Sequence, residues 1–280
     1  MRTFLLLAAM AVFAGCSKYQ KVLKSEDLGY KYDMAVKYYN DGEYYKALAL
    51  FEELIGLYTG MDKAEEIYYY YAYSNYYMED YVMAGYYFKN FVKTYPSGNH
   101  AEECMFMGAY CYYLNSPVAS LDQSNTVQAI DELQLFINRY PKSEKITQCN
   151  ELIDVLREKL ESKAYRIAKL YFNLGSYKAS AVAFDNLIKD FPDTKYKEEA
   201  YFYILKANYL LAINSIESKK KERLEAAISA YNSFENFQPN LSGLGESGGV
   251  KGADKALAKE AETILGNSKK MLENISKQIN

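Results

Sequence analysis

The chain has little of what catalysis or metal binding usually needs. Its 280 residues include one histidine, His100, four cysteines and no tryptophan. Neither the H-E-x-x-H pattern of zinc proteases nor a phosphate-binding loop occurs in it, and no two cysteines have the C-x-x-C spacing of zinc and redox sites. We therefore expect no enzymatic activity, no cofactor and no metal.

The stretch Gly245–Gly249 matches the G-x-S-x-G pattern of serine hydrolases, but its context is wrong for catalysis. A nucleophile elbow needs a strand before the serine and a helix after it, and a catalytic triad needs a positioned histidine. Ser247 instead follows Pro239 in a glycine-rich stretch. We interpret Ser247 as a linker residue and His100, which follows Asn99, as an exposed turn residue.

The charge of the chain is low and mixed in sign, with a formal net charge of -3 at pH 7. Phosphate backbones are bound by concentrated lysine and arginine, so we expect no nucleic acid partner. Half of the residues are hydrophobic and a quarter are charged, which is typical of a globular or repeat protein. The unusual feature is tyrosine, with 31 residues and the run Tyr68–Tyr71.

The N-terminus has the features of a bacterial lipoprotein signal. Arg2 supplies a positive charge, and the apolar stretch from Phe4 to Phe13 is too short to span a bilayer stably. Phe13-Ala14-Gly15-Cys16 resembles the lipobox, in which the cysteine is acylated and becomes the first mature residue. We predict a signal peptide at 1–15, lipidation of Cys16 and a lipidated tether at 16–27. Because no acidic run follows Cys16, the expected location is the periplasmic face of the outer membrane.

The other three cysteines are Cys104, Cys111 and Cys149. On one helix, Cys104 and Cys111 would lie two turns, or about 10 Å, apart, which is beyond the reach of a disulfide. We interpret all three as small core residues.

Five segments share one pattern. A small residue is followed four positions later by an aromatic residue or leucine and seven positions later by an apolar residue. A proline usually follows that apolar residue by five positions. The first segment has Thr59 in place of the proline. The matching residues are Ala47, Phe51 and Leu54; Ala84, Phe88, Phe91 and Pro96; Ala129, Leu133, Phe136 and Pro141; Ser180, Phe184, Leu187 and Pro192; and Ala227, Tyr231, Phe234 and Pro239.

Each of these segments follows another apolar segment with helical spacing. These preceding segments are residues 28–40, 64–78, 101–114, 158–174 and 196–214. A small residue lets two helices approach, the aromatic residue fills the space beside it, and proline ends the second helix. A closed helical bundle would not explain this recurrence. We predict an all-α tetratricopeptide-repeat superhelical solenoid of five helix hairpins, because hairpins of this kind bury their apolar faces only by stacking.

The predicted domains follow from these hairpins. Residues 28–157 form repeats 1–3 and residues 158–240 form repeats 4–5. A glycine-rich linker at 241–252 leads to an amphipathic helix at 253–280. We expect this helix to cap the open end of the solenoid, although it could instead bind a partner.

The first helix of each hairpin lines the concave side of such a solenoid, where tyrosine offers apolar area with a polar tip. We therefore predict a peptide-binding groove on repeats 1–3. The alternative is that these rings fill the space between repeats. The groove residues are Tyr32, Val36, Tyr39, Tyr69, Tyr73, Tyr76, Phe106, Tyr110 and Tyr113.

Together with the lipobox and the five hairpins, two stretches carry a family resemblance: Phe136–Ser143 and Leu187–Thr194. With these features the chain resembles the BamD family of outer-membrane β-barrel assembly lipoproteins. The resemblance implies a scaffold of the assembly machinery, bound to the outer membrane by its N-terminal lipid. It also implies two partners, the periplasmic domains of the barrel-shaped insertase at the last repeats and the C-terminal segments of unfolded outer-membrane proteins at the first.

Two other functions remain open at the level of sequence. The chain could be a different tetratricopeptide envelope lipoprotein that acts as a cell-division or peptidoglycan-linked scaffold, which would lack the insertase partner. It could also be a small SusD-like glycan-uptake lipoprotein, although that type normally carries a much larger inserted binding region. Identification of co-purifying partners separates these possibilities.

Overall fold

The computed structural model describes residues 18–242 and 252–279, and every regular element in these ranges is a helix. The signal peptide, Cys16 and Ser247 lie outside the described residues. The chain forms two compact units, Met1–Arg157 and Glu158–Asn280. None of the helices in the described ranges is both long enough and apolar enough to cross a membrane.

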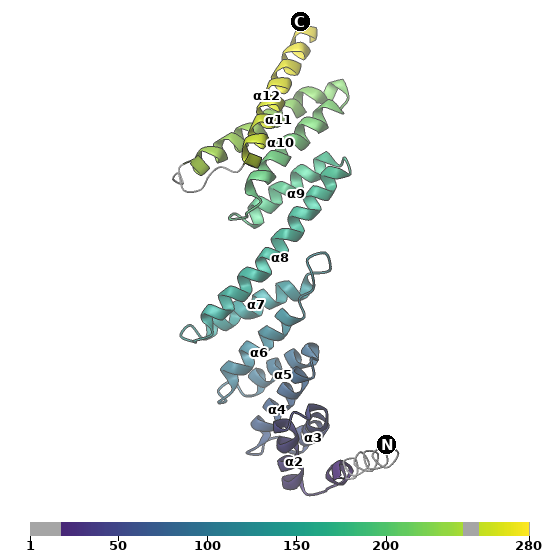
Figure 1. Cartoon of the computed structure of the whole chain (residues 1–280), viewed down its shortest axis with the longest axis vertical. Coiled ribbons are helices and arrows are strands. Elements are labelled where there is room, and N and C mark those ends of the chain that lie inside the picture. The colour runs from purple at the N-terminus through teal and green to yellow at the C-terminus, as the bar shows by residue number, and fades with distance from the viewer. Residues whose placement is uncertain (1–17, 243–251, 280) are drawn as a thin grey trace, which may run out of the picture. The chain divides into compact units, whose positions relative to one another are not determined.

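The first unit consists of consecutive antiparallel helix hairpins (Figure 1). Within each hairpin the two helices pack together, and the second helix also packs against the first helix of the next hairpin. The helices are α2 (Leu28–Asn40), α3 (Tyr44–Leu57), α4 (Ala64–Tyr77), α5 (Tyr81–Thr94), α6 (Ala101–Leu114), α7 (Ser124–Arg139) and the first part of α8 (Ile146–Asn173).

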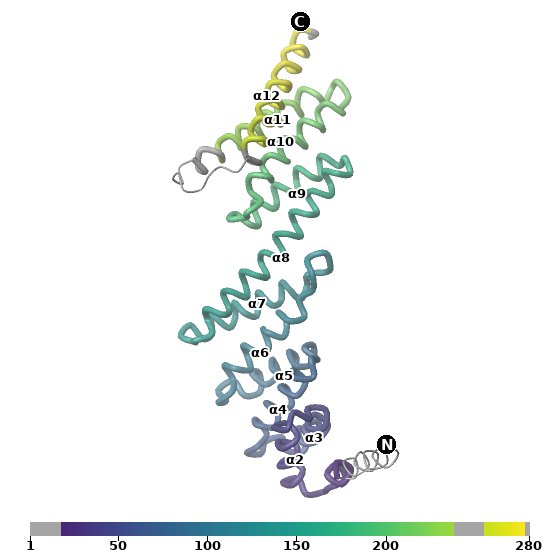
Figure 2. The backbone as a smooth tube through the Cα atoms, in the orientation of Figure 1, coloured from purple at the N-terminus to yellow at the C-terminus, as the bar shows by residue number. Residues whose placement is uncertain are grey.

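The second unit repeats this pattern, as the backbone trace also shows (Figure 2). It contains the end of α8, then α9 (Tyr177–Asp190), α10 (Lys197–Ile213), α11 (Glu217–Ser242) and α12 (Gly252–Ile279). Helix α12 packs against α10 and α11, with Ala261, Ile264 and Ser268 buried along one face. The prediction of an all-α stack of tetratricopeptide-type hairpins with a C-terminal capping helix is confirmed.

The repeated packing pattern is buried throughout. Its small, aromatic and apolar positions are all at most 9% exposed, from Ala47 in the first hairpin to Phe234 in the last. Serine replaces alanine in the fourth hairpin, and the Ser180 hydroxyl donates a 3.0 Å hydrogen bond to the carbonyl oxygen of Ala168 on α8. This bond satisfies the buried hydroxyl, so serine fits where its polarity would otherwise be costly.

Three of the turns within the hairpins use the left-handed backbone region. Gly42 joins α2 to α3 with φ 76°, and Gly175 joins α8 to α9 with φ 74°. Glycine adopts this conformation without a Cβ clash. The equivalent turn between α4 and α5 places Glu79 at φ 62°, a conformation that is unfavourable for a side chain other than glycine.

Two helix boundaries differ from the expectation. Helix α8 begins at Ile146 rather than near residue 158, and its first half contributes Cys149, Ile153 and Leu156 to the core of the first unit. Helix α11 continues to Ser242, so Pro239 does not end it. Proline lacks a backbone N–H and so removes one helical hydrogen bond, here within the last turn of α11.

The three cysteines of the repeats are buried and free, as expected. Burial raises the pKa of Cys111 to about 12 and that of Cys149 to about 11. These thiols therefore stay protonated and serve as small apolar groups.

Replacing Ala84 with leucine should destabilise the protein by about 1–3 kcal/mol, because Ala84 is fully buried between α5 and its neighbours and extra methyl groups have no space there. Val82→Leu on the same helix is the control, since Val82 is 69% exposed. Thermal unfolding of both variants checks this. Equal melting temperatures for the two would show that the helix contact is misplaced.

Candidate functional site

Tyrosines of α4 bind a carboxylate at the start of α6. The Tyr73 hydroxyl donates a 2.5 Å hydrogen bond to Glu103, and the Tyr69 hydroxyl lies 3.3 Å from both oxygens of the same carboxylate. The Tyr69 ring also packs 4.1 Å, centroid to centroid, from the ring of His100. Burial, followed by the contacts with Glu103, raises the pKa of Tyr73, so its hydroxyl remains a donor.

The same link recurs at the tetratricopeptide spacing. Tyr32 of α2 bonds to Glu66 in the first turn of α4, and Tyr165 of α8 bonds to Glu199 in the first turn of α10. Each tyrosine precedes its glutamate by 34 residues, as Tyr69 precedes Glu103. These pairs join the first helices of successive hairpins within each unit, a role for tyrosine beyond groove lining.

Part of the expected groove is therefore core. Tyr73 is 7% exposed, and Tyr32 and Phe106 are similarly buried. Tyr73 packs edge-on against Phe88, and Phe106 packs against Phe136. These three rings fill space between helices and offer little area to a ligand. Whether the remaining positions bind peptide stays a prediction.

The other expected positions remain accessible in part and form a connected set. Tyr39, Tyr69, Tyr76, Tyr110 and Tyr113 are each half-buried, as is Val36, which packs in the core of the first hairpin. The Tyr110 and Tyr113 rings stack 5.6 Å apart. The charges of neighbouring tyrosines contribute to the raised pKa of Tyr39 and of Tyr76, behind burial as the main cause.

Tyr77 is an accessible ring that the sequence pattern missed. It is 46% exposed, stacks on Tyr44 at 4.5 Å and lies 5.9 Å from both Tyr39 and Tyr73. A helical repeat selects about one residue per turn, so the pattern includes Tyr76 and omits the residue next to it. The run of tyrosines in α4 was the available signal. We call the following set the tyrosine surface: Tyr39, Tyr69, Tyr76, Tyr77, Tyr110 and Tyr113.

The first unit also has a hollow on another face of α6. A cavity of about 610 Å³ lies between α5, α6 and α7. Its floor includes Gly108 and Ala109, and Tyr86, Met105 and Leu135 contribute apolar walls. Helical periodicity places Met105 and Ala109 on a different side of α6 from Tyr110, so this hollow is separate from the tyrosine surface.

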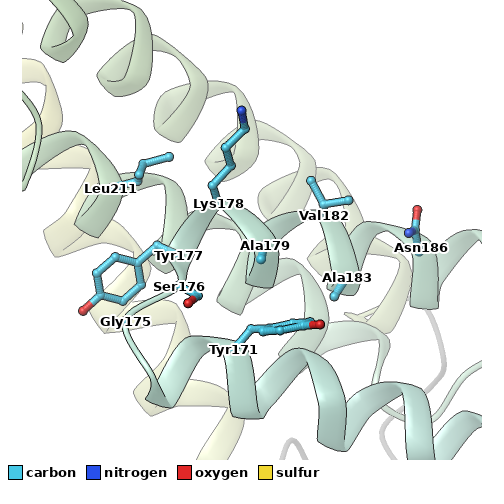
Figure 3. A pocket seen from close by; sticks show the side chains of 10 residues that line it. All are labelled: Tyr171, Gly175, Ser176, Tyr177, Lys178, Ala179, Val182, Ala183, Asn186 and Leu211. Atoms are coloured by element: carbon cyan, nitrogen blue, oxygen red, sulfur yellow. The ribbon is translucent and has the colours of Figure 1, made fainter.

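The second unit has an apolar hollow of about 710 Å³ between the end of α8, α9 and α10. Figure 3 shows Tyr171 of α8 below, Leu211 of α10 above, and the α9 residues Ala179 and Val182 between them. Leu174, which precedes the lining residue Gly175 in the sequence, is 68% exposed. Contiguous exposed apolar surface of this kind typically marks a protein contact site.

Within the described ranges, no group of three or more histidine, cysteine or carboxylate side chains is arranged to hold a metal ion. The prominent features are a tyrosine surface, an apolar hollow and stacked helix hairpins. These features define the class: an all-helical repeat protein with accessible aromatic and apolar surface on its hairpins.

Comparison with known sequences gives the family. Residues 26–224 match the family described as "YfiO: Outer membrane lipoprotein". The chain belongs to this family. The match extends over both structural units, from the residue before the Asp27 cap of α2 to Leu224 in α11.

Two relatives carry assembly-factor names. The "Outer membrane protein assembly factor BamD" of Caulobacter vibrioides is 28% identical over 142 residues, which is 51% of this chain and 45% of that protein. The "Putative outer membrane protein assembly factor BamD" of Aquifex aeolicus is 26% identical over 230 residues, which is 80% of this chain and 74% of that protein. The aligned part is thus less than half of the Caulobacter protein.

Among solved structures, the yeast Sti1 "TPR2AB-domain:pHSP90-complex" is 13% identical, with a TM-score of 0.38. The match covers 90% of this chain and 94% of that one. This likeness is too low to support a conclusion, and the assignment of tetratricopeptide-type hairpins rests on the buried packing pattern described above.

Tyr73→Ala should destabilise the first unit by about 3–5 kcal/mol, because it removes a buried ring and leaves Glu103 without its shortest hydrogen bond. Tyr77→Ala should cost about 1 kcal/mol or less, since that ring is half exposed. Denaturant unfolding of both variants measures the difference. Equal losses would contradict the division into core and accessible tyrosines.

Proposed function

We propose that this protein is a non-catalytic assembly factor for outer-membrane β-barrel proteins. In this proposal it is held on the periplasmic face of the outer membrane by lipid on Cys16. Family membership and the names of both relatives support the role. The observation in the structure that carries it is the tyrosine surface, which runs over three successive hairpins.

The tyrosine surface is proposed to receive the C-terminal segments of unfolded outer-membrane proteins. Such segments alternate apolar and polar residues as transmembrane strands do. Tyrosine rings supply apolar contact area at low cost in rotamer freedom, and their hydroxyls can bond to exposed backbone groups. A row of rings with no net charge also tolerates clients of varied sequence.

The apolar hollow of the second unit is proposed to dock the insertase. Tyr171, Val182 and Leu211 line it and Leu174 flanks it, so a partner that covers this region would bury several apolar side chains at once. Desolvated apolar clusters of this kind contribute most of the binding energy in protein interfaces. The client and the insertase therefore use different units of the chain.

Changing Tyr76, Tyr77 and Tyr110 together to alanine should weaken binding of a peptide from the C-terminal strand of an outer-membrane protein. Each lost ring should cost about 1–2 kcal/mol of binding free energy. These residues are chosen because all three are accessible, whereas Tyr73 is core. Fluorescence titration with a labelled peptide measures the effect.

The matched control changes three exposed tyrosines outside the tyrosine surface, Tyr30, Tyr45 and Tyr86, to alanine. It should bind the peptide as the wild type does. If the first variant keeps its fold and still binds with wild-type affinity, the client site lies elsewhere.

Leu174→Glu combined with Val182→Glu should abolish co-purification of the insertase, since two charges would be buried in an apolar contact. Peptide binding by the first unit should be unchanged. Val82→Glu, an equally exposed apolar position on α5, is the control. Recovery of the insertase by the double variant would refute this docking site, and recovery of division or peptidoglycan-linked proteins instead would favour the scaffold function.

A further inference from the structure

The segment that follows Cys16 is packed onto the first hairpin. Residues 18–23 are helical, and Val22 is 1% exposed in the core formed by α2 and α3. The Tyr19 ring packs edge-on against Tyr38, 5.7 Å between centroids, and its hydroxyl donates to the carbonyl oxygen of Lys46 at 3.5 Å. Most of the stretch expected to be a tether therefore belongs to the folded unit.

A buried lysine holds the end of this short helix in place. Lys31 of α2 is 2% exposed, and its Nζ donates to the Leu23 carbonyl oxygen at 3.1 Å and to Glu53 Oε1 at 2.6 Å. A buried ammonium group needs such partners, because leaving it unpaired costs several kcal/mol. Loss of the Leu23 contact would leave Lys31 short of a partner, so the helix is held against the hairpin.

This packing limits how far the first hairpin can lie from a lipid on Cys16. Lys18 is two positions after Cys16, and an extended chain spans at most about 7 Å over that interval. This step depends on the proposed lipidation of Cys16. With the acyl chains in the bilayer, the helix at 18–23 would lie at the level of the lipid headgroups.

The accessible side chains of this region suit a headgroup surface. Lys18, Lys21 and Lys24 are all exposed and spaced three residues apart, which gathers them on one side of the helical turn. None of the three forms an ion pair with another residue in the described ranges. Positive charges next to an acyl anchor strengthen attachment to anionic lipid.

Two exposed tyrosines lie close to the pair of Tyr19 and Tyr38 that joins this short helix to the hairpin. Tyr45 is 72% exposed and close enough to Tyr19 that its charge adds to burial in raising the pKa of Tyr19. Tyr30 is also exposed. Tyrosine is favoured at membrane interfaces, where its ring meets the acyl region and its hydroxyl stays hydrated.

Residues 18–27 hold three lysines and two carboxylates, Glu26 and Asp27, so the segment keeps a net positive charge. Asp27 accepts a hydrogen bond from the Tyr30 backbone N–H and so caps α2, and Glu43 pairs with Lys46. We propose that Lys18, Lys21 and Lys24, with Tyr45 and Tyr30, form a contact surface for anionic phospholipid headgroups. The lipid anchor and this surface together would hold the first hairpin flat against the bilayer rather than at the end of a free tether.

The test uses the full mature chain without its lipid, made as Cys16→Ser. Co-sedimentation with phosphatidylcholine vesicles that contain phosphatidylglycerol should show binding that weakens as salt is added, and pure phosphatidylcholine vesicles should bind much less. Changing Lys18, Lys21 and Lys24 to glutamine should weaken binding to the anionic vesicles about 100-fold at low salt, because each lysine should contribute roughly fivefold.

The matched control changes the lysine run Lys219–Lys221 of α11 to glutamine, which removes the same charge elsewhere. Its affinity for anionic vesicles should stay within about twofold of that of the parent chain. This change is smaller than the one expected from the loss of a single lysine of the proposed surface. Two outcomes would overturn the proposal. One is that the triple variant at Lys18, Lys21 and Lys24 binds as well as the parent chain, and the other is that the Lys219–Lys221 control loses as much affinity as that variant. Circular dichroism of each variant establishes that the helices are intact.

A fluorescent reporter tests the position of the contact. Because the chain has no tryptophan, Tyr45→Trp introduces a single one at the proposed surface. Its emission should shift to the blue on anionic vesicles, whereas Tyr86→Trp on α5 should not shift. A shift at Tyr86 without one at Tyr45 would place the membrane contact on another hairpin and refute the proposal.

These measurements are independent of the proposed function. Vesicle binding by an unlipidated chain requires neither processing at Cys16 nor any protein partner. Fatty-acid labelling of wild type and Cys16→Ala tests the anchor separately. If the wild type is not labelled but the unlipidated chain binds vesicles, only the lipid anchor is contradicted. If the wild type is labelled but the unlipidated chain does not bind vesicles, only the headgroup surface is contradicted.

Discussion

Each hairpin of this protein depends on its neighbour to cover apolar surface, and the feature that makes this possible is a small residue with a large apolar side chain one turn further along the same helix. Ala84 and Phe88 are both fully buried, because α5 packs on α4 on one side and on α6 on the other. A larger residue at the alanine would separate the helices, and a smaller one at the phenylalanine would leave a void. The turns, the helix lengths and the accessible surfaces are all arranged around this repeated contact.

Several tyrosines both fill space between helices and form hydrogen bonds. In the pairs of Tyr32 with Glu66 and Tyr165 with Glu199, the hydroxyl bonds to the first turn of a helix in the next hairpin. A phenylalanine could fill the same space but could not satisfy that carboxylate. The buried Tyr73 ring also packs against two more accessible rings, those of Tyr69 and Tyr77. In the proposed client-binding function, this support from a packed aromatic layer would lower the entropic cost of binding an extended segment.

Periodicity made much of this structure predictable. The spacing from Ala129 to Phe136 recurs in each hairpin, and such local spacing fixes which helix face is apolar and where the helices meet. Periodicity could not give the start of α8 at Ile146. The first half of α8 packs in the core of the first unit, and spacing along one helix does not show which helices it contacts. It also could not show that residues 18–23 pack on the first hairpin, a contact that depends on Lys31 and Glu53, 22 positions apart.

The sequence by itself determined the fold class, the hairpin packing positions, the burial of the cysteines and the family resemblance, because all of these depend on residue spacing along single helices or on local motifs. Only the tertiary structure decided which tyrosines are accessible. Tyr73 and Tyr77 are four residues apart, about one turn, and share a chemical type, yet Glu103 and Phe88 from other helices enclose the first and leave the second exposed. Exposure is set by what neighbouring helices cover, and no pattern within one helix contains that information.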